Sequence, residues 1–120
     1  MKKLILIGIL PILIGCKRSL ENTIKEGSFS VCPNVTVQKL FTKFLKNPNW
    51  EGFLSPDDNK FHLNVSGSFA IEGQRKNMLV QFQYTEGDNW EVNAMEIDGE
   101  NVSTDEWGGI IEYICEYVNQ

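Results

Sequence analysis

The apolar residues change their spacing along the chain, and each spacing predicts a different kind of segment. Residues 4–13 are almost continuously apolar. Residues 37–45 place apolar side chains on one helix face, at Val37, Leu40, Phe41, Phe44 and Leu45. We therefore expect a helix over residues 37–45, and we expect Asn47 and Pro48 to stop it.

Alternation of apolar and polar residues predicts three strands after this helix. Residues 61–69, 78–84 and 90–94 alternate in this way, which gives each strand one apolar and one polar face. Met95 and Ile97 continue the third strand in the opposite phase, which suggests a bulge or the end of the strand. The linkers 70–77 and 85–89 contain the Gly, Asn and Asp residues that are typical of turns. Because these linkers are short, we expect antiparallel hairpins.

A second helix is expected near the C-terminus. Ser103 and Glu106 have the spacing of a capping box, and an apolar stripe follows at Trp107, Ile110, Ile111, Ile114 and Val118. Residues 50–54 add a candidate short strand. The order of elements predicts an α+β fold: a helix, an antiparallel meander of three to four strands, and a C-terminal helix packed on one face of the sheet.

The first 15 residues have the features of an export signal. Lys2 and Lys3 precede the apolar run, and the small residue Gly15 ends the segment. The run is too short to span a bilayer, which takes about 20 apolar residues. The chain has 120 residues, enough for one domain. We place this domain at residues 32–120, after a polar tether over residues 16–31.

The tetrapeptide Leu13-Ile14-Gly15-Cys16 resembles the lipobox of bacterial lipoproteins. This resemblance implies that residues 1–15 are removed and that the thiol of Cys16 receives a diacylglycerol, which anchors the protein in the cell envelope. Stable anchoring takes two or more acyl chains, and lipoprotein processing supplies them. In enteric bacteria an Asp after the lipidated cysteine favours the inner membrane, so Lys17 favours the outer membrane, with the domain facing the periplasm.

Two further cysteines, Cys32 and Cys115, remain in the chain. In an oxidising compartment such as the periplasm, two remaining cysteines commonly form a disulfide. The alternative is that both are small buried apolar residues with reduced thiols. A bond between them would close most of the domain into one loop.

Charge is distributed unevenly. The net charge of −5 becomes −7 without Lys2 and Lys3, and residues 86–120 carry ten acidic residues but no Lys or Arg. This acidity argues against nucleic-acid binding, which depends on cationic contacts to phosphates. We expect this segment to present a surface for a cationic protein partner, with contributions from Glu106, Glu112 and Glu116.

Pairing within the domain is the alternative explanation of these acidic residues. Their partners would be Lys39, Lys43 and Lys46 of the first predicted helix. Exposed ion pairs contribute only about 0–1 kcal/mol each, so stability alone explains the segregation of charge poorly. The basic residues near the N-terminus would instead lie against anionic lipid headgroups.

No residue pattern indicates catalysis. His62 is the only histidine and lies on the polar side of a predicted strand, where we expect an exposed side chain without a catalytic role. The cysteines lack zinc-site spacing, and the sequence has no nucleophile elbow or phosphate-binding glycine loop. Residues 57–59 lack the further ligands of a calcium loop and are interpreted as a solvated turn. We therefore predict a protein that is not an enzyme and has no metal or cofactor.

The folded part resembles small uncharacterised exported proteins of bacteria, in residues 49–53, 61–69, 80–82 and 90–97. No activity follows from this resemblance. Periplasmic lysozyme inhibitors share the size, anchor and strand content of the chain, but their Ser-Gly-x-x-Tyr type of loop is absent. The leading hypothesis is therefore a lipid-anchored envelope protein that binds another protein. The alternative is an inhibitor or immunity factor directed at a toxin, a phage or a muramidase.

Substitution of Cys16 by Ser tests the anchor. Because the thiol is the site of lipidation in the resembled family, we expect Cys16→Ser to give a soluble or unprocessed protein, whereas the parent chain incorporates radiolabelled palmitate. Mass spectrometry of the mature N-terminus is the second measurement. An unmodified Cys16 in mature protein would contradict the hypothesis.

Overall fold

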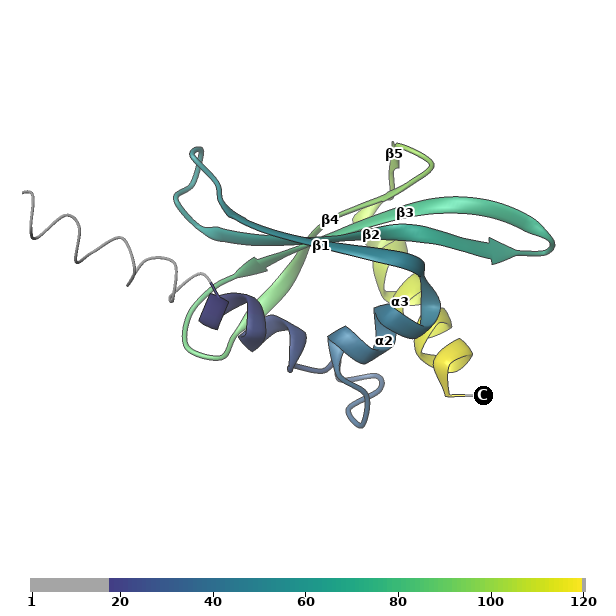
Figure 1. The fold of residues 1–120 in the computed structure, drawn as a ribbon, viewed down its shortest axis with the longest axis horizontal. Coiled ribbons are helices and arrows are strands. Elements are labelled where there is room, and N and C mark those ends of the chain that lie inside the picture. The colour runs from purple at the N-terminus through teal and green to yellow at the C-terminus, as the bar shows by residue number, and fades with distance from the viewer. Residues whose placement is uncertain (1–17, 120) are drawn as a thin grey trace, which may run out of the picture.

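A computed structural model describes residues 18–119 of the chain. The fold is α+β, as the sequence predicts (Figure 1). A helix over residues 18–25 comes first. The later elements are α2 (Val37–Phe44), β1 (Lys46–Leu54), β2 (Phe61–Ile71), β3 (Gln74–Tyr84), β4 (Trp90–Ile97), β5 (Glu100–Asn101) and α3 (Thr104–Val118).

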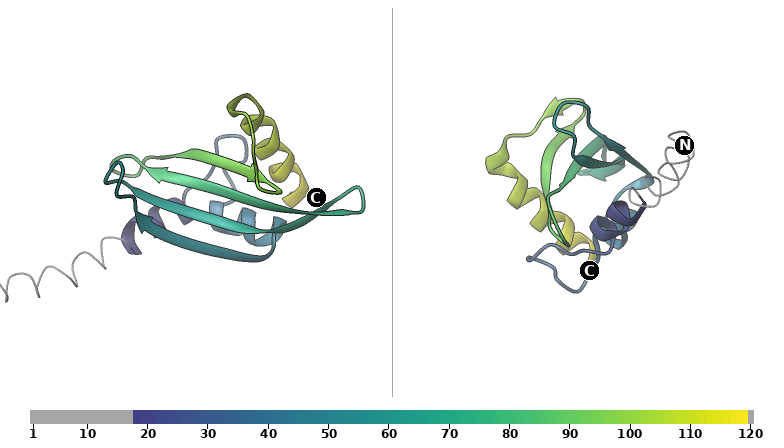
Figure 2. Two further views of the ribbon diagram at one scale, coloured as in Figure 1. Left: turned by 90° about the horizontal axis from the view of Figure 1, so that it is seen from above. Right: turned by 90° about the vertical axis from the view of Figure 1, so that its left-hand side faces the viewer.

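The five strands form one antiparallel sheet in the order β1-β2-β3-β4-β5. The helices lie together on one face of this sheet (Figures 1 and 2). Val65 of β2 pairs with Val80 of β3, and Val80 pairs with Met95 of β4. These three side chains are at most 1% exposed, because the apolar side of the alternation faces the helices. The predicted meander is thus confirmed. It has one strand more than the three to four predicted, because β5 has only two residues and is too short to show an alternation.

The strands extend further than the alternation indicates. Residues 70–77 are not a linker: β2 and β3 continue to a two-residue turn at Glu72 and Gly73, which both have positive φ. Such turns match the twist of hairpin strands. β1 also begins early, at Lys46, and runs through Pro48. An edge strand can hold a proline because its outer amide has no strand partner.

Residues 18–31 are part of the folded unit, so the prediction of a tether over residues 16–31 is wrong for this stretch. Ile24 is completely buried. Phe29 packs against Phe82 and Trp90, with ring centroids 6.2 and 5.3 Å apart. The sequence of residues 18–31 does not predict this packing on the core, because only a few of its side chains are apolar and contact the core. Cys16 and the predicted signal lie outside the described residues. Within residues 18–119, no helix has the length and apolar character needed to cross a bilayer.

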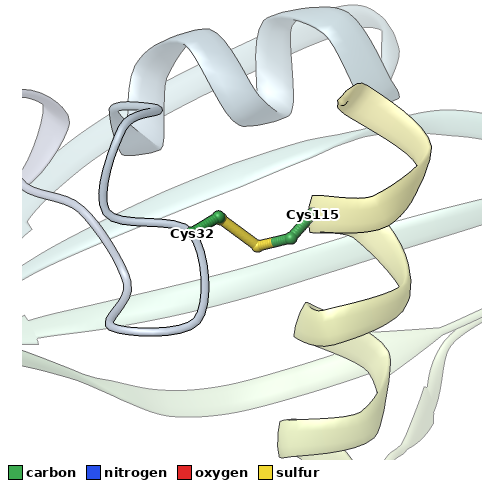
Figure 3. The surroundings of a disulfide bond; sticks show 2 residues. All are labelled: Cys32 and Cys115. Atoms are coloured by element: carbon green, nitrogen blue, oxygen red, sulfur yellow. A yellow bond between two sulfur atoms is a disulfide. The ribbon is translucent and has the colours of Figure 1, made fainter. Parts of the chain in front are cut away.

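A disulfide joins Cys32 to Cys115, as predicted (Figure 3). Cys32 lies in the loop before α2, and Cys115 lies on α3. Their Cα atoms are 5.9 Å apart, which is within the usual range for a disulfide. Both residues are buried, with exposed fractions of 5% and 3%. The bond therefore fixes the last helix to the N-terminal loop.

Reduction of this bond is expected to lower the free energy of unfolding. A loop of this length contributes roughly 4.5 kcal/mol in the chain-entropy model, and measured losses are about 2–5 kcal/mol. Urea denaturation with and without dithiothreitol measures the loss. The variant Cys32→Ala/Cys115→Ala is the control and should not respond to the reductant. Equal unfolding midpoints for the parent chain in both conditions would contradict the stabilising role.

Candidate interaction surface

The helix α3 contacts the rest of the domain through one narrow face. Ile111, Ile114 and Cys115 are buried, and the indole Nε1 of Trp107 donates a hydrogen bond to the carbonyl of Val102 at 2.9 Å. Ser103 is the N-cap, but its side chain makes no capping hydrogen bond, so the predicted capping box is not formed. Most of the remaining surface of the helix faces solvent.

The acidic residues of this helix are exposed and do not pair with the lysines of α2. The side chains of Glu106, Glu112 and Glu116 all lie on the exposed side. Within residues 18–119 the ion pairs are Lys25 with Glu21, His62 with Asp58, and Lys76 with Asp98. The alternative pairing with Lys39, Lys43 and Lys46 is therefore absent from the described part of the chain.

The exposed side of α3 is poorly suited to stabilise the helix itself. Glu112 and Glu116 are one turn apart, where like charges destabilise a helix by about 0.2–0.5 kcal/mol. The last turn contains no basic residue, although cations are favoured there by the helix dipole. Gly108 and Gly109 each cost roughly 1 kcal/mol relative to Ala. A Cβ at either glycine would meet no atom within 4 Å, so packing inside the domain does not require them.

One side of α3 borders a groove, which we call the acidic groove. It has a volume of about 620 Å³ and lies between α3, the loop over residues 28–31 and the start of β4. Its aromatic lining consists of Phe29, Trp90 and Trp107, and its charged lining consists of Asp88 and Glu91. Val31, which is 55% exposed, also borders a second hollow lined by Glu112 and Glu116. Among the described residues, these two hollows are lined by four carboxylates and by no basic side chain.

The other flank of α3 borders an apolar groove of about 510 Å³. Phe69, Met78 and Ile97 line it from the sheet, and Gly109 and Ile110 line it from the helix. Glu106 and Lys76 are its charged residues. The two grooves therefore differ in charge. The apolar groove has one acidic and one basic residue, whereas the charged residues of the acidic groove are both acidic.

The prediction that the side chain of His62 is exposed is wrong. The residue is only 5% exposed, because the ring of Phe53 stacks on it with centroids 5.4 Å apart. Its Nε2 lies 3.1 Å from Oδ2 of Asp58, and its Nδ1 lies 3.1 Å from Oε1 of Gln81. Gln81 in turn accepts a hydrogen bond from Asn93 at 2.6 Å. The imidazole thus belongs to a polar network on the sheet face opposite the helices.

Metal-binding geometry is not found in the described residues: no three His, Cys, Asp or Glu side chains within residues 18–119 are grouped to hold an ion. Comparison of the chain with protein-family models, curated proteins and solved structures gives no significant match. The candidate functional site is therefore the surface of α3.

The sequence located only part of this surface. The three predicted residues Glu106, Glu112 and Glu116 share one helix, but Glu106 lines the apolar groove, whereas Glu112 and Glu116 line the second hollow beside Val31. The sequence pattern does not predict the aromatic lining of the acidic groove, because it places Trp90 and Trp107 on the apolar faces of their elements. Their partial exposure depends on the path of the loop over residues 28–31, which the sequence pattern does not specify.

The polar network leads to a prediction about acid stability. The backbone N–H of Lys60 donates to the carboxylate of Asp58 at 2.9 Å, and this bond, aided by His62, lowers the pKa of Asp58 below its ordinary value of 3.8. A carboxyl group with a lowered folded-state pKa stabilises the fold above its unfolded pKa, and this contribution is lost as the pH falls through the folded value.

We expect the carboxyl carbon of Asp58 to titrate below pH 3.8 when followed by NMR. The variant Asp58→Asn should lose less stability than the parent chain when urea denaturation is repeated at decreasing pH below about 4. The exposed neighbour Asp57, in the variant Asp57→Asn, is the matched control. Titration of Asp58 at or above the ordinary value would contradict the assignment.

Proposed function

We propose that this chain is a lipid-anchored protein of the bacterial envelope, without enzymatic activity, whose domain binds a cationic protein through the acidic flank of α3. The anchor follows from the lipobox resemblance at Cys16. The binding role is supported by Glu112 and Glu116, a like-charged pair that is exposed and has no basic partner in the described residues.

Several features on the same side of α3 reduce the stability of this helix. Like charges at Glu112 and Glu116, a last turn without a base, and glycine at residue 108 all weaken the helix. None is compensated by a contact within residues 18–119. A cationic partner would neutralise the carboxylates, and the acidic field would increase its association rate.

The same surface supports a second candidate, an inhibitor or immunity factor. A cationic toxin or muramidase would meet the acidic flank in the same way as any other basic protein. The two candidates differ in the effect on the partner, since an inhibitor abolishes the partner's activity whereas a binding module leaves it unchanged.

Charge reversal on α3 tests the proposal. The protein and the variant Glu112→Lys/Glu116→Lys are used to capture partners from detergent-solubilised envelopes, followed by association kinetics with the captured protein over a salt series. We expect the variant to associate at least about tenfold more slowly at low salt and to show a flatter salt dependence.

The matched control is Glu51→Lys/Glu72→Lys, which changes the net charge equally at two exposed residues away from α3. This control should retain nearly the parent rate. The proposal fails if both double variants associate equally, because net charge rather than this surface would then govern association. It also fails if the kinetics of the α3 variant match those of the parent chain at every salt concentration.

A further inference from the structure

The acidic groove combines aromatic rings with carboxylates, a lining that suits one particular side chain. We propose that it binds an arginine side chain of the cationic partner, with the guanidinium against the indoles and paired with Asp88 or Glu91. This inference rests on the proposed function, because it names the residue type by which the partner would be recognised.

The aromatic lining is held in place before any ligand binds. The ring of Trp90 makes edge contacts with Phe29 and Phe82, at centroid distances of 5.3 and 5.5 Å. Trp107 is held by its hydrogen bond to the carbonyl of Val102. Both indoles are partly exposed in the groove. Rings fixed in this way lose little conformational entropy on binding, so they provide a prepared surface for a planar cation.

The charged groups of the groove have a single sign. Asp88 and Glu91 are exposed and, within residues 18–119, are the only charged residues that line it. Neither is among the ion pairs found within residues 18–119. A cation entering the groove would therefore meet two carboxylates that form no ion pair within residues 18–119, while Arg18 shares only a neighbouring hollow with Asp88.

Arginine fits this combination better than lysine. The guanidinium is planar, stacks on aromatic faces and donates to a carboxylate through two parallel N–H groups. The ammonium of lysine is a more strongly hydrated point charge, which forms the ion pair but gains less from stacking. The indoles should thus bind an arginine-containing peptide more tightly than a lysine-containing peptide of equal charge.

Gly108 leaves the space that this side chain would occupy. The residue lines the groove, and a Cβ built on it meets no atom within 4 Å. Gly109, its neighbour on α3, lines the apolar groove instead and is equally open. Leucine at either position should raise the helix propensity, but only Gly108→Leu would fill the acidic groove.

These two glycines provide a matched pair of variants for the test. The probes are two fluorescein-labelled nonapeptides, one with alternating arginine and glycine and one with alternating lysine and glycine. Fluorescence anisotropy measures their affinities for the parent domain, Gly108→Leu, Gly109→Leu and Trp107→Leu. NMR follows the indole N–H resonances of the parent domain during the titration.

We expect both peptides to bind the parent domain in a salt-dependent way, the arginine peptide roughly two- to tenfold more tightly. Gly108→Leu and Trp107→Leu should abolish this preference, and Gly109→Leu should keep it. Both glycine variants should unfold at a urea concentration no lower than the parent domain. The indole resonances of Trp90 and Trp107 should shift more than that of Trp50.

Four results would overturn the inference. Equal affinity of the two peptides for the parent domain would exclude arginine recognition while leaving the proposed function intact. An arginine preference that survives in Gly108→Leu, or that disappears equally in Gly109→Leu, would place recognition outside the groove. If neither peptide binds at low salt, both the inference and the proposed function fail.

Discussion

The disulfide between Cys32 and Cys115 is the constraint on which the arrangement of the surface depends. The helix α3 buries only three residues and follows a strand of two residues, so its own contacts with the sheet are few. The bond ties it to the loop before α2 (Figure 3). This loop also contributes Phe29 and Val31 to the acidic groove. One covalent link therefore holds two walls of the same groove.

The two sides of α3 serve different requirements. Its inner side follows the rules of a stable core, with Ile111 and Ile114 buried and at the spacing of one helix face. Its outer side combines acidic residues with glycine, which disfavours the isolated helix. The buried contacts and the disulfide make this combination tolerable, since the helix does not depend on its own propensity. The exposed surface of the domain can therefore differ from what helix stability alone would favour.

Local periodicity was sufficient to predict the fold class and the order of the elements, but it missed features that arise from contacts across the sheet. The alternation over β2 correctly separates Leu63 from His62, yet it cannot indicate that the polar side chain is covered by Phe53 of the neighbouring strand. The helix over residues 18–25 escapes prediction for a related reason, since Leu20 and Ile24 are its only apolar residues and two positions are too few to establish a period. The acidic residues of α3 were identified from charge alone, whereas the aromatic lining of the groove requires knowledge of the loop path.

The early start of the folded unit has a consequence for the geometry of attachment. The helix over residues 18–25 packs on the core through Ile24, and only one residue, Lys17, stands between Cys16 and the first described residue. The two residue steps from Cys16 to residue 18 span at most about 7 Å even when fully extended. A lipid on Cys16, as proposed, would hold the domain directly against the bilayer surface, without a long flexible linker between them. Its encounters would then occur largely in a thin layer along the membrane, where the effective concentration of partners in the same leaflet is high.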